Sequence, residues 1–448
     1  MVAEFVCGVR EKNPLSLSAC KNLPEYRDTG YCVLHFPGKE KREDFEQVKK
    51  DKLEQEDYDF SGTVFPKGIS DFSRFVFDGN ADFTGATFVG KADFTEAQFC
   101  GEWTTFSGAQ FSGERTDFLV AQFNAAETLF NVAQFSGEGI DFLGAQFSGE
   151  WTTFSGAEFS GESTSFSRAQ FRAAETDFLR AQFNAAATFF NVAQFGSAET
   201  SFQEATFSKK VYFSGVTFSE KVTFWGTQGN LVFGPGAWAQ FDRSRIDKPE
   251  QFTFNAVLLH PGWFINADVR KVDFTDVKWY GMPGGPEGTI EAEVKALEER
   301  GVESPYTQLS QACRRLSANA EENREYPLAN EFYYWSMNSL RKEGWRSLGV
   351  IGTLYWALSG YGVRATRAFL VLVGICAAFA ALYMLFGPPK LEDLGQALVY
   401  SLGAVARLNP EPRPTEPGLF QFLVIVEGLL GPLQIALLAL AVRRKVMR

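Results

Sequence analysis

"DFTEAQFCGEWTTFSGAQF" (Asp93–Phe111) returns almost unchanged as "DFLGAQFSGEWTTFSGAEF" (Asp141–Phe159). In each copy two phenylalanines lie five residues apart, and successive pairs start 12 residues apart. Neither a helix nor simple strand alternation produces a large residue after five and then seven positions. The short fixed period instead predicts a solenoid, in which the chain turns a corner every few residues and stacks each phenylalanine on its counterpart in the next coil.

The amino-acid composition agrees with such a repeated role, because the chain has 46 Phe but only 13 Tyr and 9 Trp. The pairs run from Phe60 to Phe218, and an alanine usually stands two positions before the second Phe of a pair. Steps of five and seven predict a coil of about 24 residues if it has four sides, hence about seven coils. Burial of each ring contributes ~1.5–3 kcal/mol, so the rings can stabilise the fold.

This repeat, a small or apolar residue two positions before Phe, resembles that of the pentapeptide-repeat family. The resemblance extends from Tyr58 to about Tyr280 and implies a right-handed four-sided β-helix. The seven-residue steps depart from the regular five residues per side, which implies two enlarged corners in each coil. Gly284-Gly285-Pro286 is expected to end the solenoid, so residues 58–283 form one predicted domain.

Residues 1–57, ahead of the solenoid, contain four candidate metal ligands in the pattern C-x12-C-x11-C-x2-H: Cys7, Cys20, Cys32 and His35. A thiolate and an imidazole on one knuckle are typical of zinc sites, and four protein ligands leave no open position for catalysis. A structural zinc would also compensate for a small apolar core. The alternative is a set of free cytosolic thiols. The segment resembles the Cys-rich leader of some pentapeptide-repeat proteins.

Two segments near the C-terminus are long and apolar enough to cross a bilayer, which takes roughly 20 residues. They are Ala368–Phe386, with no charge, and Leu419–Val442, with Glu427 alone. Basic residues flank the outer ends of both segments: Arg364, Arg367, Arg443, Arg444, Lys445 and Arg448. By the positive-inside rule both termini are expected in the cytoplasm of a bacterium, with two passes through the inner membrane. A buried hairpin of a soluble protein is the alternative.

An α-helical linker is predicted between solenoid and membrane, over residues 284–346. Apolar residues recur at three- and four-residue spacing after Tyr306, and a second helix is expected from about Pro327. This stretch resembles the helical pair that joins solenoid to membrane in channel-like pentapeptide proteins. Residues 347–448 form the predicted membrane domain, in which Leu348–Leu358 is too short to span and is expected to lie at the interface.

The stretch "LSGYGVR" contains Gly360-Tyr361-Gly362, the triplet of potassium-channel filters. It precedes the first span, whereas a filter must lie between two spans, so a turn is expected here. Residues 393–406 are the candidate pore helix, and Val424–Lys445 resembles the last helix of two-span potassium channels. Between them, "RLNPEPRPTEP" (residues 407–417) stands where Thr-x-Gly-Tyr-Gly-Asp would be needed, so potassium selectivity is not expected.

Three residues of the second span are candidates for a pore or a hinge: Glu427, Gly431 and Pro432. An ionisable group inside a span usually faces a bundle interior or water. Glu427 is therefore expected either to face a pore or to hydrogen-bond the pore helix. Gly431-Pro432 favours a kink, which would act as a hinge or simply bend the helix.

The sequence shows no nucleophile–base pair and no phosphate-binding loop, so we do not expect an enzyme. A net charge of −11 argues against direct nucleic-acid binding, which requires a basic face. Residues 81–224 contain 17 Asp or Glu against 8 Lys or Arg. This excess fits either solubility of a Phe-rich rod or mimicry of DNA.

The leading hypothesis is a membrane-anchored protein whose cytoplasmic solenoid binds a protein partner. Through the helical linker it would be coupled to an ion-channel-like two-span domain, a degenerate or non-selective pore. Such a pore needs several copies, so a homo-oligomer is expected, and a tetramer if the domain is channel-like. The alternative is a membrane-tethered acidic DNA mimic that acts on a nucleic-acid enzyme such as gyrase.

Overall fold

The computed structural model divides the chain into two compact units, residues 1–287 and residues 288–448. It describes residues 7, 19–20, 23–227, 229–391, 393–408, 410–412 and 418–446. Expectations for the rest of residues 1–22, for much of the 407–417 loop and for Arg448 lie outside the described residues. The two units are described one at a time.

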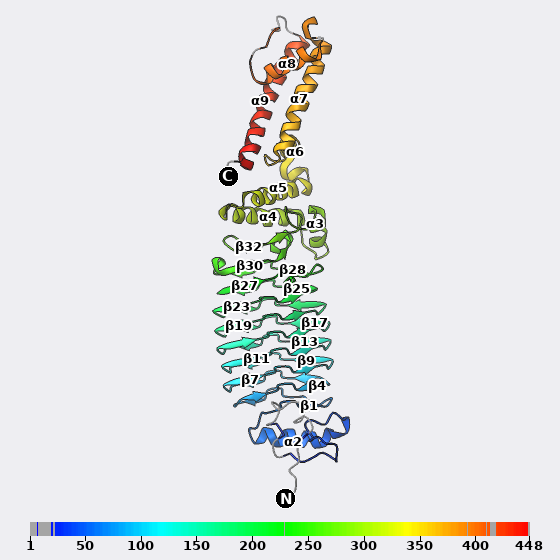
Figure 1. The fold of residues 1–448 in the computed structure, drawn as a ribbon, viewed down its shortest axis with the longest axis vertical. Helices are drawn as coiled ribbons and strands as arrows, with labels where there is room; N and C mark the ends of the chain where they lie inside the picture. The colour runs from blue at the N-terminus through cyan, green and yellow to red at the C-terminus, as the bar shows by residue number, and fades with distance from the viewer. Residues whose placement is uncertain are drawn as a thin grey trace. The chain divides into compact units, whose positions relative to one another are not determined.

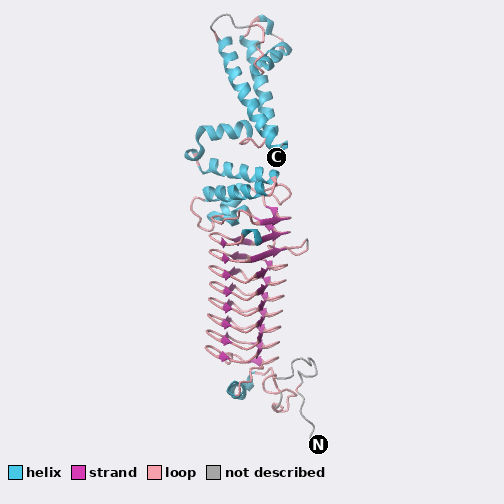
Figure 2. Ribbon diagram, turned by 90° about the vertical axis from the view of Figure 1, so that its left-hand side faces the viewer, coloured by secondary structure: helices cyan, strands magenta, loops and turns pink. Residues whose placement is uncertain are grey.

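The first unit is a parallel β-solenoid with four sheets, each running along the stack of coils (Figures 1 and 2). The first sheet contains β1 (Val64–Phe65), β4 (Thr87–Phe88), β8 (Gln110–Phe111), β12 (Gln134–Phe135), β16 (Glu158–Phe159), β20 (Gln182–Phe183) and β24 (Thr206–Phe207). The second contains β2 (Val76–Phe77), β6 (Gln98–Phe99), β10 (Gln122–Phe123), β14 (Gln146–Phe147), β18 (Gln170–Phe171), β22 (Gln194–Phe195), β26 (Thr217–Phe218) and β29 (Arg245–Ile246).

The remaining two large sheets have longer strands. The third contains β3 (Ala81–Asp82), β7 (Trp103–Thr105), β11 (Glu127–Leu129), β15 (Trp151–Thr153), β19 (Glu175–Asp177), β23 (Glu199–Ser201), β27 (Lys221–Trp225), β30 (Phe252–Asn255) and β32 (Asp273–Thr275). The fourth contains β5 (Ala92–Asp93), β9 (Arg115–Asp117), β13 (Gly139–Asp141), β17 (Ser163–Ser165), β21 (Ala187–Phe189), β25 (Lys210–Tyr212) and β28 (Trp238–Gln240). Since each coil visits the third, first, fourth and second sheets in turn, the third and fourth sheets form opposite sides.

The phenylalanines form four columns inside the solenoid, as the repeat predicts. Phe94, Phe118 and Phe142 are fully buried and 24 residues apart, and their ring centroids follow at 4.8 and 4.7 Å with nearly parallel planes. Alanines two positions before a phenylalanine, such as Ala97 and Ala121, are buried as well. Parallel strands place identical residues in register from coil to coil, so one repeat unit fills the core at every level.

The stack is longer than the seven coils counted from the regular pairs, because irregular coils continue it. The third sheet has nine strands, which corresponds to about nine turns. In its last strands Phe224 stacks on Phe254 at 5.1 Å and Phe254 on Phe274 at 5.6 Å. A short sheet of β31 (Leu258–Leu259) and β33 (Lys278–Trp279) brings Trp279 against Phe274, where the columns end.

A helix that the sequence did not predict, α2 (Arg42–Glu54), covers the N-terminal end of the columns. Each of the four columns is closed by a different contact. Phe45 packs edge-on to Phe65 at 5.4 Å, the Lys49 ammonium lies 4.1 Å from the centre of Phe72, the Lys52 ammonium lies 5.7 Å from that of Phe60, and Tyr58 packs against Phe77 at 5.3 Å. Cations over exposed ring faces are favourable, so α2 caps the stack.

The second unit is helical throughout its described residues, apart from turns and loops. Its elements are α3 (Ile290–Glu298), α4 (Pro305–Glu322), α5 (Tyr326–Glu343), α6 (Trp345–Ser359), α7 (Ala365–Phe386), the 3-10 helix η4 (Pro389–Leu391), α8 (Leu394–Val405) and α9 (Leu419–Val446). The expected helical pair corresponds to α4 and α5, joined by a Ser310–Ser336 side-chain hydrogen bond of 3.0 Å. Two helices, α7 and α9, are long and apolar enough to cross a membrane.

One turn position in the solenoid departs from the residue type that its backbone favours. Two positions after a phenylalanine the chain adopts φ near +60°, and in this column Gly108 and Gly156 lie on either side of Val132. Val132 has φ of 50° and is 60% exposed. A β-branched residue is strained in this conformation, at roughly 1–2 kcal/mol.

We expect Val132→Gly to raise the free energy of unfolding by about 0.5–1 kcal/mol, because relief of this strain exceeds the extra entropy that glycine gives the unfolded chain. Chemical unfolding followed by circular dichroism measures the change. Val132→Ala is the control, since it keeps the Cβ atom and hence the strain. A glycine variant no more stable than the alanine variant would contradict the explanation.

The capping helix gives a pH dependence. Burial lowers the pKa of Lys49 from 10.5 to about 8, although the charges of Asp71 and Glu46 oppose the shift. Between these two values the unfolded chain holds a proton that the folded chain has lost, so the free energy of unfolding rises with pH in this window. In Lys49→Met this increment is missing. We therefore expect the stability of the variant relative to wild type to fall as the pH rises from 8 to 10.5.

Lys50→Met is the matched control, because the neighbouring Lys50 side chain is 67% exposed. Denaturation midpoints for the three proteins at several pH values test the difference. Parallel pH curves for wild type and Lys49→Met would rule out a titrating Lys49 in the cap.

Candidate metal centre and a buried polar cluster

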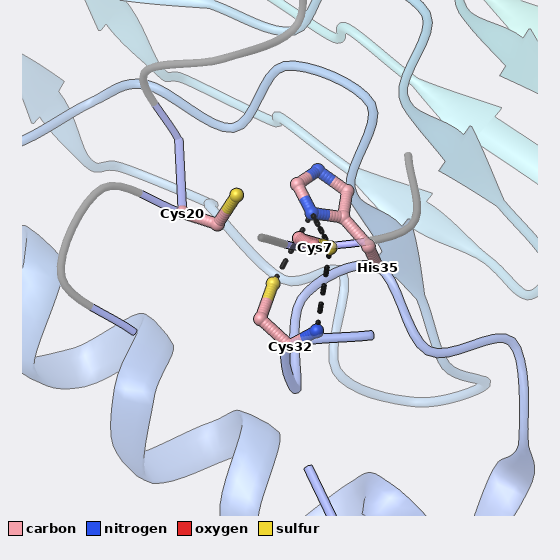
Figure 3. Close-up of side chains that lie close together, drawn as sticks. All are labelled: Cys7, Cys20, Cys32 and His35. Atoms are coloured by element: carbon pink, nitrogen blue, oxygen red, sulfur yellow. Dashed lines mark hydrogen bonds between the residues drawn. The ribbon is translucent and has the colours of Figure 1, made fainter. Parts of the chain in front are cut away.

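The four candidate metal ligands converge on one point (Figure 3), although 12 and 11 residues separate the first three in sequence. Their ligand atoms, three sulfurs and one ring nitrogen, all lie within 4.8 Å of one another. Cys7, Cys32 and His35 are buried, and Cys20 is half-buried. A backbone hydrogen bond of 3.2 Å from the amide of His35 to the carbonyl of Cys32 closes the turn that aims both side chains inward.

The imidazole of His35 is oriented for ligation through Nδ1. This atom lies 3.1 Å from the Cys32 sulfur and 3.5 Å from the Cys7 sulfur. On its other edge, Nε2 is 3.0 Å from the carbonyl oxygen of Ser61, to which it can donate only as Nε2–H. This tautomer leaves the Nδ1 lone pair for a metal, in the manner of metal-binding histidines held by a carbonyl.

The thiols share their protons unequally. Hydrogen bonds from Cys32 and His35 lower the pKa of Cys20 to about 4, against the opposing effect of burial. The pKa of Cys32 is raised, first by its hydrogen bond to Cys20 and then by burial. The cluster thus favours a thiolate even at neutral pH, which is the form that binds a metal.

Separations of 3.1–4.8 Å fit the edges of a tetrahedron around one ion, since ligand distances of about 2.0–2.3 Å place neighbouring ligand atoms roughly 3.5–3.8 Å apart. The four residues can therefore hold a metal ion between them. All four ligand positions are protein groups, so such a centre would be structural.

The knuckle is fastened to the first solenoid coil by contacts that sequence patterns do not show. The carbonyl oxygen of Leu34 accepts hydrogen bonds from the Val64 amide at 3.0 Å and from the buried Lys41 ammonium at 2.8 Å. Burial lowers the pKa of Lys41 to about 7. The contacts of Ser61 and Leu34 use backbone carbonyls, which every residue carries, so no residue type could have marked them in advance.

A second polar cluster lies among the apolar helices. Glu427 of α9 is fully buried and accepts hydrogen bonds from Tyr383 of α7, at 2.6 Å, and from Ser401 of α8. The Ser401 hydroxyl also lies 3.2 Å from the carbonyl oxygen of Cys376. One carboxyl group therefore joins three helices, and its contact with α8 is a contact with the candidate pore helix. Within this unit Glu427 does not face solvent.

The other two candidates on α9 lie one turn further along. The helix is continuous through Pro432. A Cβ atom on Gly431 would come within 2.8 Å of Val405, so glycine permits the close approach of α9 and the end of α8. Two residues later, the side-chain amide of Gln434 donates to the carbonyl oxygens of Leu358 and Ala368, at 3.0 and 2.7 Å. Sequence reasoning did not single out Gln434.

The Gly-Tyr-Gly triplet forms a buried turn between α6 and α7. Its three residues, Gly360, Tyr361 and Gly362, have φ of 56°, 59° and 70°. Tyr361 is fully buried and packs against Tyr334 and Tyr355. The triplet precedes the first apolar helix, where the sequence predicts a turn.

Comparison with known proteins supports the assignment of the repeats. Residues 72–122 match the family model of pentapeptide repeats (9 copies). The curated proteins and the solved structures gave no match to the chain. The predicted pentapeptide repeats are confirmed, and the columns of phenylalanine continue the same geometry beyond the matched segment.

Proposed function

We propose that this pentapeptide-repeat solenoid is a protein-binding rod held at the bacterial inner membrane by α7 and α9, and that α7, α8 and α9 form a channel-like module. The observation that carries the proposal is the exposure of the two long apolar helices. In the most apolar 18-residue stretch of each, only 22% of residues are buried. Leu385 and Leu429 are 73% and 63% exposed. The core helix of a soluble protein would be covered, whereas lipid covers these faces without cost.

The polar contacts at the outer ends of the two helices support an orientation with both ends on one side. Arg364, just before α7, forms a two-pronged ion pair with Glu331 of α5 at 2.5 and 2.7 Å. Arg444, near the end of α9, donates to the carbonyl oxygen of Tyr361 at 3.4 Å. Because basic residues concentrate here, the positive-inside rule favours the cytoplasm for this side.

A channel-like role is supported by a short helix between two spans. Asp393 caps α8 by accepting a hydrogen bond from the Gln396 amide at 3.2 Å. A pore requires several copies, so the protein acts as a homo-oligomer, a tetramer if it follows two-span channels. The loop after α8 has no potassium-filter sequence, so the pore is non-selective or degenerate.

The membrane part of the proposal predicts two results. The full chain should remain in the membrane fraction after a high-pH carbonate wash, because only lipid covers α7 and α9. Purified protein in planar bilayers should carry small currents with little preference among monovalent cations. Release by carbonate would reject the membrane assignment, and silence at all voltages and ions would reduce the module to an anchor.

We also propose that the metal is zinc, in a structural role. Three thiolates and one imidazole match the ligands that zinc prefers, and the region around them has a small apolar core. The solenoid would then begin from a metal-fastened knuckle, since His35 and Leu34 contact its first coil.

Elemental analysis of the full chain, purified under reducing conditions, should find one zinc per chain. Cys32→Ser should lose it, and Cys100→Ser should retain it, because Cys100 is exposed and lies outside the cluster. Wild-type protein without metal at neutral pH would reject the site.

A further inference from the structure

The outer face of the third sheet carries a row of alternating tryptophan and glutamate. Strand register aligns Trp103 with Glu127, Glu127 with Trp151, Trp151 with Glu175, and Glu175 with Glu199 (Figure 1, β7 to β23). The residue after each of them is a buried threonine, so the row itself faces outward. Trp151 is 39% exposed. Large exposed indoles on a rigid face are typical of binding sites rather than of a bare surface.

The carboxylates of this row lack cations of their own. Glu127 and Glu175 are exposed, and neither forms an ion pair with any residue that the structure describes; the same holds for Glu102 and Glu150 at the adjoining corner. Glu199 alone pairs, with Lys221 at 2.8 Å. Several like charges thus lie along one face, next to indole rings, with one lysine at the end of the row.

The opposite side of the solenoid shows what a self-sufficient face looks like. On the fourth sheet, Lys91 pairs with Asp93 and Asp117 at 2.6 and 3.1 Å, and Arg115 pairs with Asp117 and Asp141 at 2.5 and 3.5 Å. These aspartates are neutralised from within the sheet. The third sheet therefore differs from the fourth in leaving its negative charge to be neutralised by another molecule.

We propose that the Trp–Glu row of the third sheet binds an α-helix of a partner protein through arginines on one face of that helix. This inference rests on the proposed role of the solenoid as a protein-binding rod and names the face and the chemistry. A guanidinium can stack on an indole and at the same time donate to a neighbouring carboxylate, which an ammonium does less well. Arginine, rather than lysine, is the residue that the alternation fits.

The spacing selects a helix lying along the stack. Adjacent coils are about 4.8 Å apart, so Trp103 and Trp151, two coils apart, are separated by roughly 10 Å. Helical residues i and i+7 are about 10.5 Å apart on the same face. Arginines at i and i+7 would thus stack on the two indoles, and one at i+3 or i+4 would face Glu127 between them.

The test uses the full chain in detergent and three helical peptides of equal length and charge. In one peptide arginines occupy i, i+4 and i+7; in the second, lysines occupy the same positions; in the third, the same arginines are distributed around the helix. Isothermal titration should show that the first peptide binds about fivefold more tightly than either of the others, the size expected of one or two stacked guanidinium groups. Equal affinities would reduce binding to general attraction by the net charge and overturn the proposal.

Variants assign the binding to this face. Trp151→Ala and the double change Glu127→Gln with Glu175→Gln should each remove the preference for the first peptide. Glu138→Gln with Glu162→Gln, which removes the same charge at the opposite side, should leave it unchanged; both residues are exposed and precede strands of the fourth sheet. If the opposite-side pair removed the preference equally, the assignment to the third sheet would be wrong. Circular dichroism would exclude loss of fold in each variant.

The outcome is separable from the fate of the broader proposal. Photo-crosslinkers placed in turn at outward positions of all four sheets, in native membranes, ask whether any face of the solenoid contacts a protein. Contacts confined to other faces would overturn the third-sheet site and leave the protein-binding rod intact. Contacts at Trp103 and Trp151 that registered peptide abolishes, and scrambled peptide does not, would support the site.

Discussion

Everything in the first unit depends on face-to-face stacking of phenylalanine rings between coils. Parallel strands repeat at about 4.8 Å, and the rings of Phe83 and Phe106, or of Phe106 and Phe130, stack at 4.8 and 4.9 Å. The spacing of the backbone hydrogen bonds and the spacing preferred by the rings therefore coincide. A chain that places an aromatic residue at every inward corner satisfies both at once, which explains why one residue type is used so often.

A stack of this kind leaves ring faces bare at its ends, and the protein closes them differently. At the N-terminal end, α2 covers the four columns with two lysines and two aromatic side chains, and the knuckle of Cys32 and His35 is fastened beside it. At the other end the coils become irregular until Trp279 closes the stack. The metal centre is thus part of the device that starts the solenoid, and no exposed ring face is left as a site for end-to-end association.

The second unit is organised by polar contacts among apolar helices. A single carboxyl group, Glu427, holds α7, α8 and α9 together, and Gln434 holds α9 to the backbone next to the Gly-Tyr-Gly turn. Such contacts matter most where lipid offers no hydrogen bonds of its own. They define the packing of the three helices, while the exposed faces of α7 and α9 remain available to lipid or to other copies of the chain.

The repeat, the four sides, the two apolar helices and the metal ligands were all visible in the sequence, because each depends on residue type at fixed spacing. Cys7, Cys20, Cys32 and His35 are chemically distinctive, and a period of 24 residues needs no knowledge of neighbours. The tertiary structure alone decided the rest: the capping by α2, the contact of His35 with Ser61, the partners of Glu427 and the alignment of Trp103, Glu127 and Trp151 on one face. These depend on backbone carbonyls and on register between distant segments, which the order of residues along a chain does not display until the coils are stacked.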